Sequence, residues 1–128
     1  MLSFDEMESI ARQLISPTQL NKHVTYGQVA AVIQCESGNV YTGINIDTDC
    51  SMGFCAEHSA IADMIKHGEN RIVKVIAVNH HGKIIPPCGR CREFISQINR
   101  ENVQSEIKVN KEQVLRLSEL LPFDWKNA

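Results

Sequence analysis

The sequence lacks the features of a secreted or membrane-embedded protein. Residues 1–14 have no basic segment followed by an apolar one, which is the order typical of a signal peptide. No apolar run approaches the roughly 20 residues that a membrane-spanning helix requires. We therefore expect a cytoplasmic protein without membrane contacts, in which the thiols stay reduced.

Positive charge is scarce as well. Lys and Arg number 13 against 15 Asp and Glu, so the formal net charge is −2. This balance provides no basic surface for nucleic acid or for anionic lipid. Aromatic residues make up 5% of the chain, which leaves few side chains on which the bases of a nucleic-acid strand could stack. The sequence thus disfavours an enzyme that edits RNA or DNA and favours a small-molecule partner.

Repeats, linkers and low-complexity segments are also absent, and 128 residues suffice for one domain, residues 1–128, with a buried core. Helical and strand-forming patterns alternate along the chain. They predict helices over residues 5–16, 55–67 and 89–100, a β-hairpin over 24–34 and 39–46, a buried strand over 71–79, and short strands over 105–109 and 113–117. Such alternation indicates an α/β fold, a three-layer α/β/α sandwich with helices on both faces of a mixed sheet.

What the sequence does contain is an unusual set of cysteines. Five is an odd number for disulfides, so metal binding or catalysis is the better interpretation. Cys88 and Cys91 are separated by two residues, a spacing that places both sulfurs on one side of a turn and suits one zinc ion. Cys55 opens another predicted helix, with Glu57 two residues later. Three thiolates leave a fourth tetrahedral position for water, as in a catalytic zinc site, and Glu57 would transfer that water's proton.

Such a site has a charge problem, because zinc with three thiolates carries a net charge of −1. A positive group should compensate it. Arg90 lies between the two paired cysteines, and His58 adjoins the glutamate. We expect Arg90 to carry this role, assisted by the helix N-termini, with His58 beside the metal ligands.

The remaining cysteines and histidines leave alternatives open. Cys50 could join the other three cysteines in a closed structural zinc site, although Glu57 would then have no role. Cys35 falls in a predicted strand and is interpreted as a small buried hydrophobic residue. His80 and His81 fall in a loop, and the sequence does not assign them a function.

Two motifs together resemble a known family. Cys-Ala-Glu at 55–57, followed by Pro-Cys-Gly-Arg-Cys at 87–91, resembles the zinc signature of the cytidine deaminase superfamily in its three-cysteine form. The resemblance covers residues 24–125. The motif PCGRCRE and the C-terminal segment LLPFDW are most similar to the blasticidin-S deaminase branch, and the small homotetrameric cytidine deaminases are almost as similar.

The resemblance implies a fold, a reaction and an assembly. The family has a five-stranded mixed sheet between helices, binds one Zn²⁺ per chain, and hydrolyses the amino group at C4 of a cytosine ring with release of ammonia. Its small members are tetramers whose sites borrow residues from neighbouring subunits. Phe123 and Trp125 are candidates to cover the base or a neighbour's site.

The resemblance also implies individual roles. The zinc ligands would be Cys55, Cys88 and Cys91, and Glu57 would be the catalytic proton carrier. The substrate contacts would come from Asn45 and Asp47 at the sugar, and from Ala56 and Pro87 at the pyrimidine.

The chain departs from the family pattern near the substrate. The family usually has glutamate at Asp47 and arginine at His58, and the loop 45–55 differs in length from both branches. The expected substrate is therefore a cytidine-like nucleoside, with an aminopyrimidine nucleoside antibiotic such as blasticidin S as the alternative. A non-catalytic, zinc-stabilised binding module is the alternative from another functional class.

Overall fold

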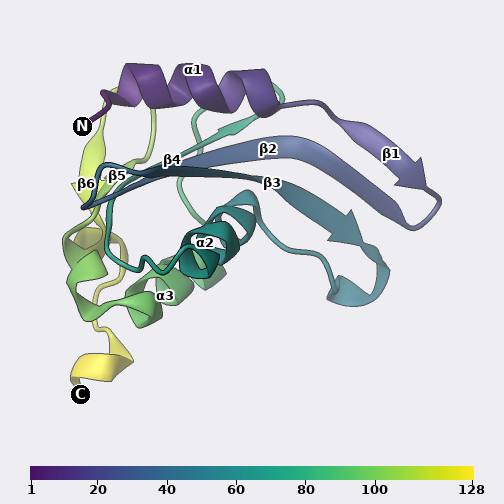
Figure 1. Ribbon diagram of the computed structural model, residues 1–128. Helices are drawn as coiled ribbons and strands as arrows, with labels where there is room; N and C mark the ends of the chain where they lie inside the picture. Colours follow the sequence, from purple (N-terminus) through teal and green to yellow (C-terminus); the bar gives the residue numbers. More distant parts are fainter.

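The computed structural model describes all residues from 1 to 128 and shows a six-stranded sheet with helices on both faces (Figure 1). The helices are α1 (Phe4–Leu14), α2 (Ala56–Lys66) and α3 (Gly89–Ile98). The strands are β1 (Thr18–Asn21), β2 (Val24–Cys35), β3 (Val40–Thr48), β4 (Ile72–Asn79), β5 (Glu106–Lys108) and β6 (Val114–Arg116). The predicted α/β class is confirmed, and each predicted helix and strand is present within a few residues of its expected bounds.

The long strand β2 organises the sheet. It pairs with β3 on one side, and on the other side with β1 along its first residues and with β4 along its second half. Only the β4–β5 pairing is parallel. The sixth strand, β1, is where the expectation of five strands is wrong. Its residues, Thr-Gln-Leu-Asn, follow Pro17 and have no strong strand pattern, and they form a short edge strand opposite Tyr26.

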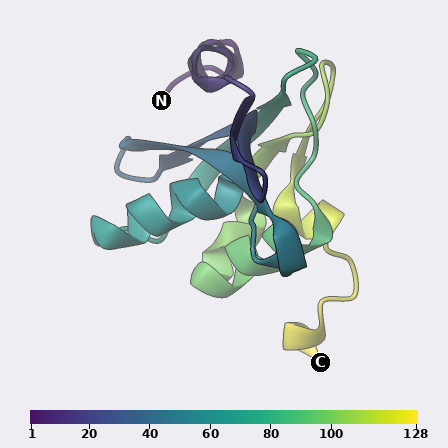
Figure 2. The ribbon, with the colours of Figure 1, turned by 90° about the vertical axis from the view of Figure 1, so that its right-hand side faces the viewer.

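Three layers follow from where the apolar side chains lie (Figure 2). On one face, Met7 and Ala11 of α1 pack with β2 and β4 residues, including Val32 and Ile76. On the other face, α2 and α3 cover a second core that includes Ile61 and Ile95 together with Ile33, Val75 and Ile107. Burial of both sheet faces explains the continuous apolar sequence of β4. None of the helices has the length and apolar character needed to cross a membrane.

One close packing contact fixes the position of α2. Gly43 of β3 lies directly beneath the first turns of α2, where a Cβ atom would come within 2.5 Å of the Ala56 carbonyl oxygen and the Ala60 nitrogen. Ser59 Oγ accepts a hydrogen bond of 3.1 Å from the backbone N–H of Ile44. The helix that begins at Cys55 is therefore held tightly against the sheet, at the edge where β3 leads into the next loop.

Candidate metal centre and active site

The N-terminal ends of two helices meet on one side of the sheet. Cys55 is the residue that caps α2, and Cys88 caps α3, both with extended backbone angles. Cys91 follows in the first turn of α3 and is fully buried. Helix N-termini carry partial positive charge, which stabilises thiolates and other anions. The fold thus brings the three predicted ligands together at two helix N-termini.

The three sulfurs form a compact triangle. Cys88 Sγ lies 3.5 Å from Cys55 Sγ and 3.6 Å from Cys91 Sγ, and the Cys55 and Cys91 sulfurs lie within 4.8 Å of each other. Zinc–sulfur bonds of about 2.3 Å at tetrahedral angles require sulfur–sulfur separations of roughly 3.8 Å. The spacing of the three sulfurs is therefore suited to one zinc ion per chain.

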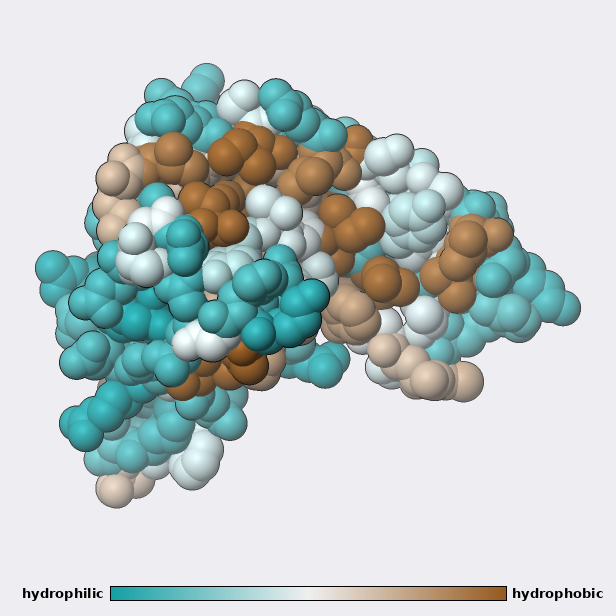
Figure 3. Space-filling view, viewed as in Figure 1, coloured by the Kyte–Doolittle hydropathy of each residue, from teal (hydrophilic) through white to brown (hydrophobic).

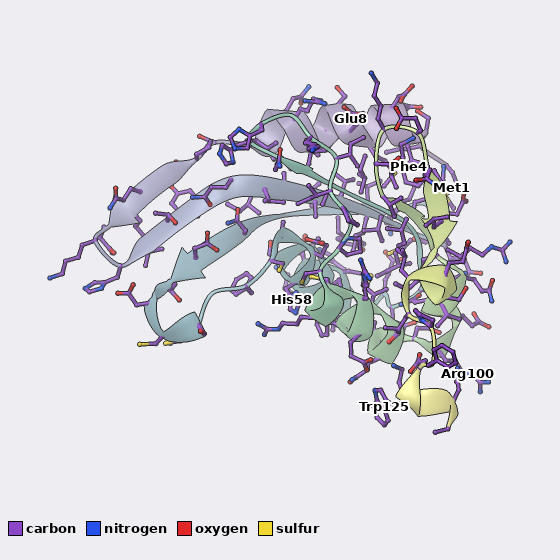
Figure 4. All side chains as sticks on the ribbon, turned by 180° about the vertical axis from the view of Figure 1, so that it is seen from behind. Met1, Phe4, Glu8, His58, Arg100 and Trp125 are labelled. Carbon is purple, nitrogen blue, oxygen red and sulfur yellow. The ribbon has the colours of Figure 1, made fainter.

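His58 lies against this centre. Its Nδ1 lies 3.4 Å from Cys91 Sγ, and its ring stacks on Phe94 with centroids 4.5 Å apart. A metal-binding arrangement of Cys55, His58 and Cys91 is also consistent with their mutual distances, all within 4.8 Å. Figure 4 shows His58 beside the ends of α2 and α3. A hydrogen bond donated by His58 to a Cys91 thiolate would offset part of the negative charge of the ligands.

Burial governs the protonation of the site. Glu57 is only 4% exposed, and its burial raises the pKa of the carboxyl group. Burial and the neighbouring Cys88 raise the pKa of the Cys55 thiol to about 11, and burial together with the charge of Glu57 raises the pKa of Cys91 further. Although burial acts in the same sense at Cys88, the backbone N–H groups of Cys91 and Arg90 and the other two thiols lower its pKa. A coordinated divalent cation removes the remaining thiol protons, so metal affinity should fall at low pH.

A cavity of about 510 Å³ leads to the cysteines and Glu57. Most of the residues predicted to form the site line it: Asn45, Asp47, Cys55, Ala56, Glu57, Cys88 and Arg90. Arg90 is exposed and makes no ion pair or hydrogen bond within the chain, so its guanidinium is free to act on the charge of the centre. The cavity thus joins a polar wall on β2 and β3 to a buried acid and the sulfurs of Cys55 and Cys88.

Two of the predicted substrate contacts, Pro87 and Trp125, do not line the cavity, and Cys50 lies apart from the metal centre. Pro87 is buried and does not line the cavity; Pro86 does, while the Pro87 carbonyl accepts a hydrogen bond of 2.8 Å from Arg92 Nε. Trp125 lies at the end of the C-terminal segment, apart from His58 and outside the cavity lining (Figure 4). Cys50 is exposed and joins no group of candidate metal ligands, which leaves the closed four-cysteine site without support.

The polar wall contains residues that sequence reasoning missed. Gln28 and His80 both line the cavity. Gln28 lies in an irregular part of β2, where the pairing changes from Tyr26↔Ile46 to Ala30↔Ile44. Three residues of β2 therefore stand opposite the single residue Asn45, and such bulges often re-aim side chains next to active sites. The Gly-Gln pair inside a strand pattern was the available signal, because an isolated glycine there marks a bulge.

Comparison with known proteins identifies the family. The family model of the cytidine and deoxycytidylate deaminase zinc-binding region matches residues 6–106 of the chain. The chain belongs to this family. The resemblance inferred from the Cys-Ala-Glu and Pro-Cys-Gly-Arg-Cys motifs is confirmed, and the family is one of zinc-dependent deaminases, in agreement with the sulfur triangle.

Individual members of the family agree in sequence and in fold. A cytidine deaminase of Mycobacterium tuberculosis is 31% identical over 96 residues, which are 73% of this chain and 69% of that protein. The crystal structure of cytidine deaminase from Mycobacterium tuberculosis matches with a TM-score of 0.79 and 23% identity, over 96% of this chain and 97% of that chain. A blasticidin-S deaminase of Bacillus cereus is 29% identical over 85 residues, 59% of this chain and 58% of that protein.

Proposed function

We propose that this chain hydrolyses the amino group of free cytidine and deoxycytidine, giving the uridine product and ammonia. One observation carries the proposal: a buried carboxyl group, Glu57, lines the same cavity as the Cys55 and Cys88 thiols, which together with the buried Cys91 thiol are spaced for one zinc ion. A structural zinc site needs neither a neighbouring buried acid nor a cavity. The cavity volume of about 510 Å³ lies within the range of roughly 300–1,000 Å³ typical of small-molecule sites.

The chain's own residues divide the chemistry among them. Cys55, Cys88 and Cys91 would hold the zinc ion, which when bound supplies a Lewis acid that makes water nucleophilic near neutral pH. Glu57 would carry one proton from the attacking water to the ring nitrogen N3, where it remains in the product, and then the second proton from the new C4 hydroxyl to the amino group that leaves as ammonia. Its burial supports this role, since a raised pKa brings the group nearer to neutrality, where both proton uptake and release are efficient.

The cavity wall would orient the substrate. The backbone at Ala56, in the first turn of α2, and the segment from Pro86 to Cys88 flank the metal end and would contact the pyrimidine ring. Asn45 and Asp47 lie on the β3 side and would face the sugar. Arg90 and His58 would compensate the charge of the three thiolates, Arg90 from the rim and His58 through its contact with Cys91.

We infer in addition that the protein acts as a homotetramer. Phe123 is fully exposed, and Trp125 is 68% exposed although its indole N–H donates to Glu93 at 3.2 Å. Large apolar side chains fixed in solvent favour a partner surface, and Trp125 does not reach its own cavity. A band of hydrophobic residues also crosses the molecule between α1 and α2 (Figure 3). In such an assembly Trp125 would cover the cavity of a neighbouring subunit.

Blasticidin S is the second candidate substrate. Aspartate at position 47 is one methylene shorter than the glutamate usual in the family, so the sugar contact should differ from that of a cytidine deaminase. The sugar of the antibiotic carries a different set of polar groups. The similarity to a blasticidin-S deaminase of Bacillus cereus supports keeping this candidate.

A substrate panel tests the proposal. The purified, zinc-loaded protein is incubated with cytidine, deoxycytidine, cytosine and blasticidin S under reducing conditions, which keep its five free cysteines reduced. Ammonia release is then measured. Turnover of cytidine or deoxycytidine is the expected result, and turnover of blasticidin S alone would favour the second candidate. A protein that binds one zinc per chain and turns over none of these compounds would contradict the proposed activity and favour a binding module.

A further inference from the structure

The hydrogen bonds around Asn45 determine which groups remain available in the polar wall. The backbone N–H of Val29, which has no partner in β3 because of the β2 bulge, donates to Asn45 Oδ1 at 2.8 Å. A backbone N–H can only donate, so the amide oxygen must face Val29 and the amide nitrogen must face the opposite way. The orientation of this buried side chain is therefore fixed by the main chain.

Both hydrogens of the Asn45 amide are also engaged. Its Nδ2 donates to Gln28 Oε1 at 2.8 Å and to Asp47 Oδ2 at 3.3 Å. An asparagine amide has only two N–H groups, so Asn45 has no donor left for a ligand. The residue holds the bulge closed and aligns its two neighbours, which is the function of a positioning residue.

The same bonds leave Gln28 and Asp47 with complementary free groups. Because Gln28 Oε1 faces Asn45, its Nε2 is left with two N–H groups, and these have no partner in the chain. The Asp47 carboxylate has no cationic partner and accepts only the bond from Asn45, so it retains free acceptor sites. A hydroxyl group has one hydrogen to donate and two lone pairs to accept, so it would match a glutamine donor and a carboxylate acceptor side by side.

From this arrangement we propose that Gln28 is a specificity-determining residue, which donates from Nε2 to a sugar hydroxyl of the substrate while Asp47 accepts from that sugar. The proposal rests on the proposed function, since it takes the substrate to be a nucleoside whose base faces the metal centre. It assigns recognition of the sugar to Gln28 and Asp47, with Asn45 in support. It also explains why the β2 bulge turns a glutamine toward the cavity at this position.

Two substitutions separate a donor role from a structural one. Gln28→Leu removes both hydrogen-bonding groups with little change in size. Gln28→Glu keeps an oxygen that can accept from Asn45 Nδ2 but has no N–H to donate. Each variant is compared with the wild-type protein by kcat/KM for cytidine and for 2′,3′-dideoxycytidine, which lacks the ring hydroxyls. The matched control is Gln113→Leu, at an exposed position directly before the edge strand β6 and outside the cavity lining.

We expect both Gln28 variants to lower kcat/KM for cytidine by roughly tenfold while leaving the value for the dideoxy compound within about twofold. Thermal unfolding and zinc content should match the wild-type protein, and Gln113→Leu should change neither substrate. The proposal would be overturned if kcat/KM fell equally for both nucleosides. It would also be overturned if the ratio of kcat/KM for cytidine to that for the dideoxy compound stayed at the wild-type value. A third contrary result is a Gln28→Glu variant that keeps the wild-type preference for cytidine while Gln28→Leu loses it. Gln28 would then act only by holding Asn45.

A binding measurement keeps this test independent of the proposed activity. Calorimetric titration of the zinc-loaded protein with uridine and 2′,3′-dideoxyuridine reports sugar recognition without any turnover. Loss of the preference for uridine in both Gln28 variants supports the proposal even if cytidine is not deaminated. Absence of wild-type turnover would count against the proposed function alone, whereas a uridine preference that survives both substitutions would count against Gln28 alone.

Discussion

His58 Nδ1 lies 3.4 Å from the sulfur of Cys91, and the imidazole ring is held in place by stacking on Phe94. This relationship puts a nitrogen donor against the most deeply buried of the three sulfurs. Burial, and then the nearby charge of Arg90, lower the pKa of His58. A neutral imidazole can still donate one N–H to a thiolate, so the contact can reduce the charge of the centre without requiring a protonated histidine.

Replacement of this histidine tests whether it supports the metal or binds it. In His58→Phe the ring can still stack on Phe94, but the nitrogen is lost. We expect one zinc per chain to remain, with affinity reduced about 10- to 100-fold, the usual effect of losing a partner of a metal ligand. Zinc content by mass spectrometry and a chelator competition measure both quantities. Complete loss of zinc in this variant would instead make His58 a ligand.

The cysteines allow a matched pair of substitutions. Cys88→Ser removes a sulfur that lies 3.5 and 3.6 Å from the other two, so zinc binding should be lost or weakened by orders of magnitude. Cys50→Ser changes an exposed thiol that contacts none of them, so zinc content and activity should equal those of the wild-type protein. Loss of zinc from the Cys50 variant would restore the closed four-cysteine site that the structure does not support.

Gly43 links the packing of the sheet to the geometry of the site. Gly43→Ala would place a methyl group within 2.5 Å of the first turn of α2, so either the helix or the strand must shift. We expect a loss of about 1–3 kcal/mol in the free energy of unfolding, together with reduced activity because Cys55 and Glu57 begin this helix. Chemical denaturation measures the first effect. Gly89→Ala is the control. A Cβ atom there meets nothing within 4 Å, so the free energy of unfolding should stay at the wild-type value.

A carboxylate far from the site makes stability depend on pH. Glu69 accepts hydrogen bonds from Ser37, Tyr41 and Asn39, and these bonds hold its pKa below the ordinary value of 4.5. A lowered pKa means that the stabilisation is complete above the ordinary value and disappears as the pH falls through the lower, folded value. We therefore expect Glu69→Gln to lower the melting temperature at pH 7, with a smaller difference at pH 3.

The control for that prediction is Glu36→Gln, in the same turn. The Glu36 side chain is exposed and accepts no hydrogen bond within the chain, so its replacement should change the melting temperature little at either pH. A difference between wild type and Glu69→Gln that stays constant from pH 7 to pH 3 would show that the Glu69 hydrogen bonds do not favour its ionised form.

Most of the fold and the metal centre could be predicted because their signals are local. Local sequence patterns predicted α2, β4 and α3, and the short spacings of the cysteines implied one ligand set before any distance was known. The strand β1 was missed because an exposed edge strand buries few side chains and needs no apolar alternation. Its position depends on pairing with Tyr26, which the sequence of residues 18–21 does not encode.

The polar wall was harder to predict, since its arrangement depends on main-chain irregularity. A bulge opposite Asn45 brings Gln28 to the cavity, and a regular β2 strand would not place three residues opposite one. The same reason explains why Pro86 lines the cavity and Pro87 does not, because only the geometry of the turn decides which of two adjacent prolines faces the cavity. Sequence spacing indicates which residue types meet, whereas the local backbone decides which groups remain free.

The most direct test of the account is Glu57→Gln, an almost isosteric replacement of the buried acid. The variant should fold, bind one zinc per chain and bind uridine, but ammonia release from cytidine should fall by about 10²- to 10⁴-fold, because no group remains to carry the proton. Wild-type turnover measured beside it provides the reference. A Glu57→Gln variant that retains both zinc and full activity would contradict the assignment of Glu57 as the proton carrier and, with it, the proposed mechanism.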